Sequence, residues 1–161
     1  MEKYVSLDRL DKRILEELQI DGALSHAELA DRVGSTAPSC WRRVRRLEEE
    51  GVFTATVRLV DQERVGRGVN VLCNVRMKDF SSESIASFEQ FARDEARIME
   101  CYRLSGDWDY LIRVVARDVA DYDEFRMQTL GKLPSVATAS SNFAMSVTKR
   151  KTAVPIDPKN G

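Results

Sequence analysis

The sequence predicts an α+β protein with an all-helical domain first and a mixed βαββαβ domain after it. Two observations lead to this fold class. In the first fifty residues, apolar side chains recur at helical spacing between capping residues. From Val69 onward, some segments alternate apolar and polar residues, as strands do, and others have apolar residues at helical spacing. Their order is strand, helix, strand, strand, helix, strand.

Two helices are predicted before the third one begins, over about residues 8–19 and 26–33. Asp8 precedes the first apolar repeat and can accept a hydrogen bond from a free backbone N–H as an N-cap. The second helix starts with a capping box, Ser25 to Glu28. Gly34 suits its end, because glycine adopts the left-handed conformation at little cost.

A third helix is predicted over about residues 37–50, with Thr36 as its N-cap and Pro38 in its first turn, where a missing N–H has no consequence. An apolar stripe of Cys40, Val44 and Leu47 shares one face of this helix. Four arginines occupy the rest of it. Arg42, Arg45 and Arg46 are expected to point broadly away from the apolar face, and Arg43 lies at its flank.

A short helix, a glycine turn and a helix with an arginine face together form helix-turn-helix geometry, whose second helix can enter the major groove of DNA. Residues near the start of that helix would approach base edges, and the remaining arginines would contact phosphates. The predicted DNA-binding residues are Thr36, Pro38, Ser39, Arg42, Arg43, Arg45 and Arg46. Residues 1–60 hold 10 Lys+Arg and 11 Asp+Glu, so placement rather than bulk charge must create the surface. The alternative is an arginine face that is merely solvated.

Composition sets the expected domain boundaries. Residues 1–60 form the helix-turn-helix domain, which ends in an extended segment, 52–60, that could serve as a wing or as a strand leading away. A hinge is expected over 61–68, because DQERVGRG is polar and contains two glycines. Residues 69–161 remain for the second domain.

The second domain should have the ferredoxin-like arrangement of four strands and two helices. Its strands are expected over about residues 69–77, 98–105, 110–114 and 137–147. Its helices should begin after serine caps at 81–82 and after Asp118. Two helices on one face leave the other face of the sheet uncovered. That open face and the free edges of the sheet invite pairing with a second copy of the chain.

The densest polar feature of this domain is the turn between its central strands, Leu104-Ser-Gly-Asp-Trp-Asp-Tyr110. Turn chemistry alone could explain it. It could also be a small-molecule site, in which backbone N–H groups near Gly106 bind a carboxylate and an Asp side chain binds an ammonium group. Paired catalytic carboxylates are a third reading. The single histidine, His26, lies where a helix begins, which disfavours catalysis that needs a positioned base.

Other classes of protein are disfavoured by composition. The chain is 43% hydrophobic and 32% charged, as in soluble globular proteins. No apolar run approaches the ~20 residues of a membrane helix, and the N-terminus lacks the apolar core of a secretory signal. The three cysteines are widely spaced and form no CxxC pair. We therefore expect a cytoplasmic protein with no membrane partner, no metal site, no cofactor and no catalytic residues.

Five sequence segments, in this order and spacing, carry a resemblance to a known family. They are Leu7-Asp8-x-x-Asp11-x-x-Ile14-Leu15, Ala30-x-x-Val33-Gly34, Arg43-Val-Arg-Arg-Leu-Glu48 with Gly51, Ser105-Gly-Asp-Trp-Asp-Tyr-Leu111, and Leu133-Pro134-x-Val136. Together they resemble the leucine-responsive regulatory protein / AsnC family of transcription regulators, almost end to end.

The resemblance implies a helix-turn-helix joined to an amino-acid-sensing domain, homodimers formed through the C-terminal sheets, and assembly of dimers into octamers. It places the effector at the contact between dimers. The implied effector-binding residues are Leu104, Ser105, Gly106, Asp107, Asp109 and Tyr110, with Ser140, Ser141 and Asn142 as lining from a neighbouring subunit. The tail, residues 149–155, resembles the tails of the subgroup whose members regulate branched-chain amino and keto acid catabolism.

The predicted function is therefore that of a sequence-specific regulator of double-stranded DNA. Its oligomeric state and DNA affinity would respond to an amino acid or a related small metabolite, through the effector's differential affinity for the assembled states. A bulky, basic Trp41-Arg42 departs from the family pattern, which predicts a different DNA sequence as its target. Two alternatives stay open at this point: an effector-binding assembly protein that does not bind DNA, and a small-metabolite enzyme.

Overall fold

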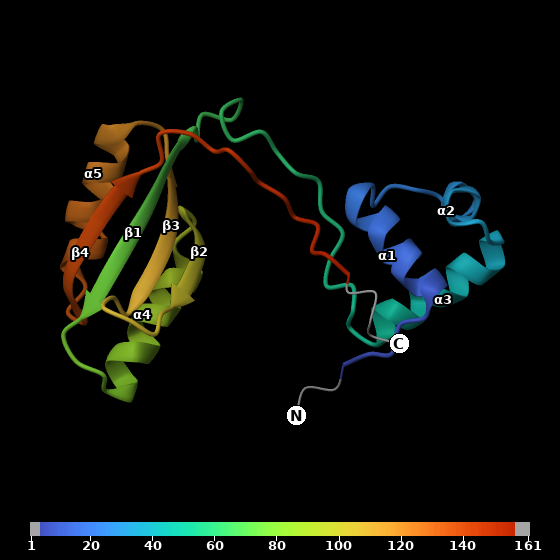
Figure 1. Cartoon of the computed structure of the whole chain (residues 1–161). Coiled ribbons are helices and arrows are strands. Elements are labelled where there is room, and N and C mark those ends of the chain that lie inside the picture. The colour runs from blue at the N-terminus through green and yellow to red at the C-terminus, as the bar shows by residue number, and fades with distance from the viewer. Residues whose placement is uncertain (1–3, 157–161) are drawn as a thin grey trace. The chain divides into compact units, whose positions relative to one another are not determined.

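The computed structural model describes residues 4–156, and the chain divides into two compact units (Figure 1). The first unit contains the residues up to Leu59 together with the tail from Lys149. The second contains residues 60–148. Each unit has its own hydrophobic core, so each is described separately.

The first unit is built from three helices, α1 (Arg9–Ile20), α2 (His26–Val33) and α3 (Ala37–Glu49). Their boundaries agree with the sequence prediction to within one residue, because each helix has its capping residue in place. Asp8, Ser25 and Thr36 each accept a hydrogen bond from the backbone N–H three residues on. Between α2 and α3, Gly34 has a φ of 63°, the left-handed conformation that was expected of it.

Apolar residues from all three helices form the core of this unit. The fully or almost fully buried members are Ile14, Leu15, Leu29, Ala30, Val33, Cys40 and Leu47. Val44, predicted on the same face of α3 as Cys40 and Leu47, is partly buried against them. The apolar face of α3 therefore lies where the helical wheel placed it.

One expectation for the first unit needs correction. Residues 52–60 form no strand within the part of the chain that the structure describes, so no β wing follows α3. The tail was expected in the second domain, and in the structure residues 149–156 group by their contacts with the first unit. Gln19 holds it there: its Nε2 donates to the Val154 carbonyl (3.1 Å), and its Oε1 accepts from the Val154 N–H (2.7 Å). Ile156 packs against the helical core.

The second unit has the ferredoxin-like order β1 (Val69–Met77), α4 (Ser82–Asp94), β2 (Ile98–Arg103), β3 (Tyr110–Ala116), α5 (Val119–Gln128), a short 3₁₀ helix η1 (Leu130–Lys132) and β4 (Val136–Phe143). The strands lie in the order β2-β3-β1-β4, and every neighbouring pair is antiparallel. The last strand is shorter than expected, because regular pairing with β1 ends at Phe143.

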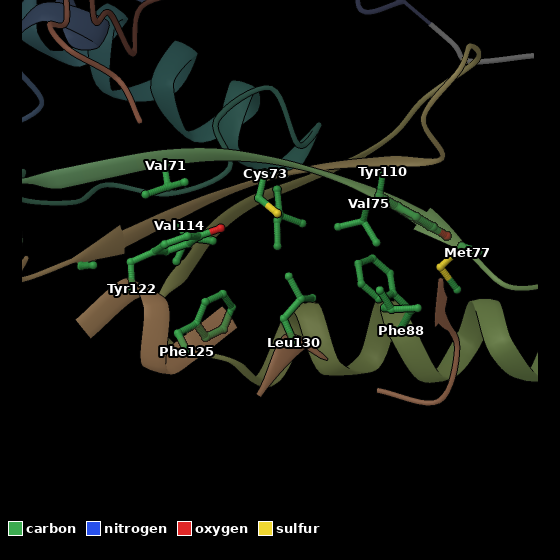
Figure 2. Close-up of a cluster of buried hydrophobic side chains, with 13 residues drawn as sticks. Val71, Cys73, Val75, Met77, Phe88, Tyr110, Val114, Tyr122, Phe125 and Leu130 are labelled. Carbon is green, nitrogen blue, oxygen red and sulfur yellow. The ribbon is translucent and has the colours of Figure 1, made fainter. Parts of the chain in front are cut away.

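The core of this unit lies between the sheet and its helices, as Figure 2 shows. Val71, Cys73 and Val75 alternate along β1 and are fully buried, so one face of the central strand points at the helices. Phe88 of α4 stacks at a tilt on Tyr110 of β3, with 4.7 Å between ring centroids. Burying a side chain such as Phe88 contributes roughly 1.5–3 kcal/mol, so this layer stabilises the sheet that carries the turn.

Candidate nucleic-acid interface and effector site

One side of α3 is exposed and basic. Residues at helical spacing on that side are Pro38, Trp41, Arg42 and Arg45, all of them exposed. Arg45 forms an exposed ion pair with Glu49 (3.3 Å), and such pairs hold a side chain weakly. Thr36 and Ser39 lie at the start of the same helix, where the Thr36 hydroxyl accepts from the Ser39 N–H (3.4 Å). This side of α3 can meet a polyanion without rearrangement.

The structure does not place all four arginines on that side. Arg46, expected to point outward, lies on the flank with Arg43, and both reach back to α1. Arg46 Nη2 lies 2.6 Å from Asp11 Oδ2, and Arg43 Nη1 lies 2.7 Å from Asp11 Oδ1. The wheel could not reveal this, because the partner carboxylate belongs to another helix.

Trp41 is a residue that the predicted DNA-binding set omitted. Trp41 is 54% exposed, next to Arg42 in the sequence and one turn before Arg45. Its ring adds apolar surface to the basic side of α3. The signal was available in the sequence, since Trp41 falls on the polar side of the wheel.

The turn between β2 and β3 is docked on the end of β1. Leu104 N–H donates to the Asp109 carbonyl (2.8 Å), and Asp109 N–H donates to the Val75 carbonyl (3.0 Å). Asp109 Oδ2 accepts from the Met77 N–H (2.7 Å). One carboxylate oxygen of Asp109 is therefore bound by the backbone of β1 and the residue is half-buried, whereas Ser105, Gly106 and Asp107 are exposed.

Arg76 of β1 holds the middle of the same turn. Its Nη2 donates to the Asp107 carbonyl (2.5 Å), and its guanidinium lies over the Trp108 ring, 5.1 Å from the centroid. This cation–π contact and the backbone contact fix the turn, but leave the Asp107 side chain open to solvent. Of the two acids in the turn, Asp107 is the more exposed.

Two residues of the predicted effector set, Tyr110 and Ser141, have their side chains on the helix side of the sheet. Tyr110 is 2% exposed, and its hydroxyl donates to Glu89 Oε1 (2.9 Å). Burial raises the pKa of Tyr110 to about 12. The Ser141 hydroxyl bonds to the Tyr122 hydroxyl (2.5 Å) on the helix side of the sheet. Strand alternation then places Ser140 and Asn142 on the opposite, open face.

A groove of about 540 Å³ lies between α4 and the edge strand β2. Glu89, Arg93, Cys101, Arg103 and Tyr110 are among its lining residues. Cys101 is exposed, whereas Cys40 and Cys73 are buried. Partial burial raises the pKa of the Cys101 thiol, which disfavours the nucleophilic thiolate.

Among residues 4–156, no helix is long and apolar enough to cross a membrane. The same residues contain no cluster of three or more His, Cys, Asp or Glu side chains that could hold a metal ion.

Comparison with known proteins agrees with this architecture. An AsnC-type helix-turn-helix domain matches residues 7–48, and an Lrp/AsnC ligand binding domain matches residues 70–154. The Bkd operon transcriptional regulator of Pseudomonas aeruginosa is 37% identical over 150 residues, which cover 93% of this chain and 98% of that protein.

Two solved structures are similar over nearly the whole chain. An AsnC family transcriptional regulator from Agrobacterium tumefaciens is 40% identical, with a TM-score of 0.88 over 92% of this chain and 97% of that one. A transcriptional regulator from Neisseria meningitidis, solved in complex with L-Met, is 29% identical, with a TM-score of 0.90 over 92% of this chain and 96% of that one. The chain belongs to the Lrp/AsnC family of transcriptional regulators.

Proposed function

We propose that this protein is a sequence-specific DNA-binding transcription regulator that responds to an amino acid or a related metabolite. The observation that carries the proposal is the exposed side of α3, with Pro38, Trp41, Arg42 and Arg45 on one face of a capped helix. In a helix-turn-helix this element enters the major groove. Thr36, Ser39 and Arg42 would face base edges, and Arg45 a phosphate.

Selection from a random duplex library tests DNA binding directly. We expect the full-length protein to enrich one imperfect palindrome, because a symmetric dimer presents two recognition helices to successive major grooves. Arg42→Ala should weaken binding to the enriched duplex and relax its sequence preference, by about 1–3 kcal/mol if Arg42 reads a base. Lys132→Ala, an exposed cation in the second unit, serves as a control. Failure to enrich any duplex would count against DNA binding.

The effector proposal rests on the exposed part of the turn, Ser105, Gly106 and Asp107. An α-amino acid has a carboxylate for the backbone N–H groups and an ammonium group for Asp107. The complex of a relative with L-Met supports this class of ligand. Ser140 and Asn142 of a neighbouring subunit remain candidate lining residues, because they lie on the open face.

A thermal-shift panel of the twenty amino acids, with L-Met among them, tests the effector. A ligand at ~100 times its dissociation constant adds about 2.7 kcal/mol of stability, which is a visible change in melting temperature. The shift should disappear in Asp107→Ala and persist in Asp123→Ala, an exposed carboxylate on α5. A shift of equal size in both variants would place the ligand elsewhere.

We further propose that the protein forms homodimers through the open face of its sheet, and that dimers assemble toward octamers in the cytoplasm. Leu72, in the central strand, is 40% exposed on that face, and Tyr102 on β2 is 52% exposed. Leu72→Glu should lower the mass measured by light scattering, because it puts a charge into the interface. Met127→Glu, at an exposed apolar residue of α5, is the matched control.

A further inference from the structure

We propose that Arg43 and Arg46 are positioning residues that hold the recognition helix in register, and that only Arg42 and Arg45 of the four arginines are free to contact DNA. The inference rests on the proposed DNA binding. It divides one arginine cluster, which looks uniform in the sequence, into two pairs with different tasks.

The centre of the arrangement is Asp11, in the first turn of α1. This residue is only 1% exposed, although aspartate is almost never fully buried unless it is paired. Both of its carboxylate oxygens are occupied. Oδ1 accepts from Arg43 Nη1 (2.7 Å), and Oδ2 accepts from Arg46 Nη2 (2.6 Å) and from the Asp8 N–H (3.0 Å).

One nitrogen of Arg43, Nη1, contacts two carboxylates. Besides Asp11 Oδ1, it donates to Asp8 Oδ2 (2.6 Å), and the Arg43 side chain is 26% exposed. Hydrogen bonds to Asp8 and Asp11 raise the pKa of Arg43 further above its already high value. Its Nε is buried and has no hydrogen-bond partner within the described part of the chain. Releasing Arg43 to a phosphate would take away the cationic partner of Asp8 and one of the two cationic partners of Asp11.

The spacing of the two arginines explains what the contact does. Arg43 and Arg46 are three residues apart, so they lie one above the other on a single flank of α3. Both reach one carboxylate at the start of α1. The apolar contacts of Cys40 and Leu47 are not directional, whereas charged hydrogen bonds have a defined geometry. The ion pairs therefore fix how α3 is rotated about its own axis.

The rotation of α3 determines which base edges its exposed side chains can contact. Base recognition in the major groove depends on the placement of a few side chains, such as Arg42, opposite the base edges. If the flank contacts are lost, the helix can turn while its net exposed charge stays available. Sequence discrimination should then fall without a change in the number of phosphates contacted.

The experiment compares four equivalent substitutions in the full-length chain: Arg43→Gln, Arg46→Gln, Arg42→Gln and Arg45→Gln. Affinity is measured for the duplex that the wild-type protein selects and for a scrambled duplex, over a range of salt concentrations. Folding of the first unit is followed by Trp41 fluorescence in a Trp108→Phe background, since the chain has two tryptophans. DNA is titrated at a temperature at which each variant is fully folded.

For Arg43→Gln and Arg46→Gln we expect a lower melting temperature. The ratio of the affinity for the selected duplex to that for the scrambled duplex should fall roughly tenfold, which is about the discrimination that one base contact provides. The salt slope, which is the change of log affinity with log salt concentration, should not change. For Arg42→Gln and Arg45→Gln we expect an unchanged melting temperature. Whichever of these two meets a phosphate should flatten the salt slope by about 0.9. Asp11→Asn should lower the ratio as Arg46→Gln does, and combining the two should add little, because they break the same contact.

Two results would overturn the inference while leaving DNA binding intact. A salt slope reduced by about 0.9 in Arg43→Gln or Arg46→Gln, with the ratio retained, would identify that residue as a phosphate contact. An unchanged ratio and slope in both folded variants would show a purely structural role. If the wild-type chain enriches no duplex at all, the proposed function itself fails, and the assignment of these residues falls with it.

Discussion

Replacing Asp109 should destabilise the second unit much more than replacing Asp107 does, although both acids lie in the same turn. Asp109→Ala removes the acceptor of the Met77 N–H at 2.7 Å, at the end of the central strand. Hydrogen bonds to charged groups contribute about 1.5–3 kcal/mol, and the orphaned amide adds to the loss. We expect the free energy of unfolding of this unit to fall by about 2 kcal/mol.

Asp107→Ala is the matched control. Its side chain is exposed, and the contact that Asp107 makes with Arg76 uses its backbone carbonyl, which alanine keeps. Such a surface substitution should change stability by no more than about 0.5 kcal/mol. The two variants thus separate the structural acid of the turn from the acid proposed to bind a ligand.

The assay is thermal unfolding followed by Trp108 fluorescence in a Trp41→Phe background, so that the signal comes from the second unit. For a domain of this size, 1 kcal/mol corresponds to about 4–8 °C, so Asp109→Ala should melt about 8–16 °C below the parent. The parent and Asp107→Ala should melt together. Equal melting temperatures for all three proteins would refute the reasoning, because the Asp109–Met77 contact would then contribute nothing.

Three further outcomes are expected. Gly34→Ala should destabilise the first unit by about 1–2 kcal/mol in chemical denaturation, because alanine is strained at a φ of 63°; an unchanged midpoint would contradict this. Gln19→Ala should speed tryptic cleavage after Arg150 and Lys151, because it removes both hydrogen bonds to Val154; an unchanged cleavage rate would show that the tail is held by other contacts. The pKa of Tyr110 is raised from 10 to about 12, so its contribution to stability is present below pH 10 and lost as pH rises toward 12. Denaturation midpoints measured across this range should fall more steeply in the wild-type protein than in Tyr110→Phe, and parallel curves would argue against it.

Local sequence signals were enough to predict the helices, the strands and their order along the chain. Asp8, Ser25 and Thr36 mark helix starts because a side-chain cap and the amide it binds lie within four residues of each other. Alternation along β1 revealed which side chains are buried for a similar reason, since a strand turns successive residues to opposite faces. Signals of this kind lie within a short window of the chain.

Which polar side chains are free to bind DNA or a ligand depends on contacts between segments that lie far apart in the sequence. Arg46 and Arg42 look equivalent on α3, but Asp11, 35 residues from Arg46, binds one and not the other. One carboxylate oxygen of Asp109, a predicted ligand group, accepts from the N–H of Met77, 32 residues away. The tail, expected in the second domain, is hydrogen-bonded at Val154 to Gln19, 135 residues away. Periodicity shows which way a side chain points, but whether it is free depends on partners that folding brings in from distant parts of the chain.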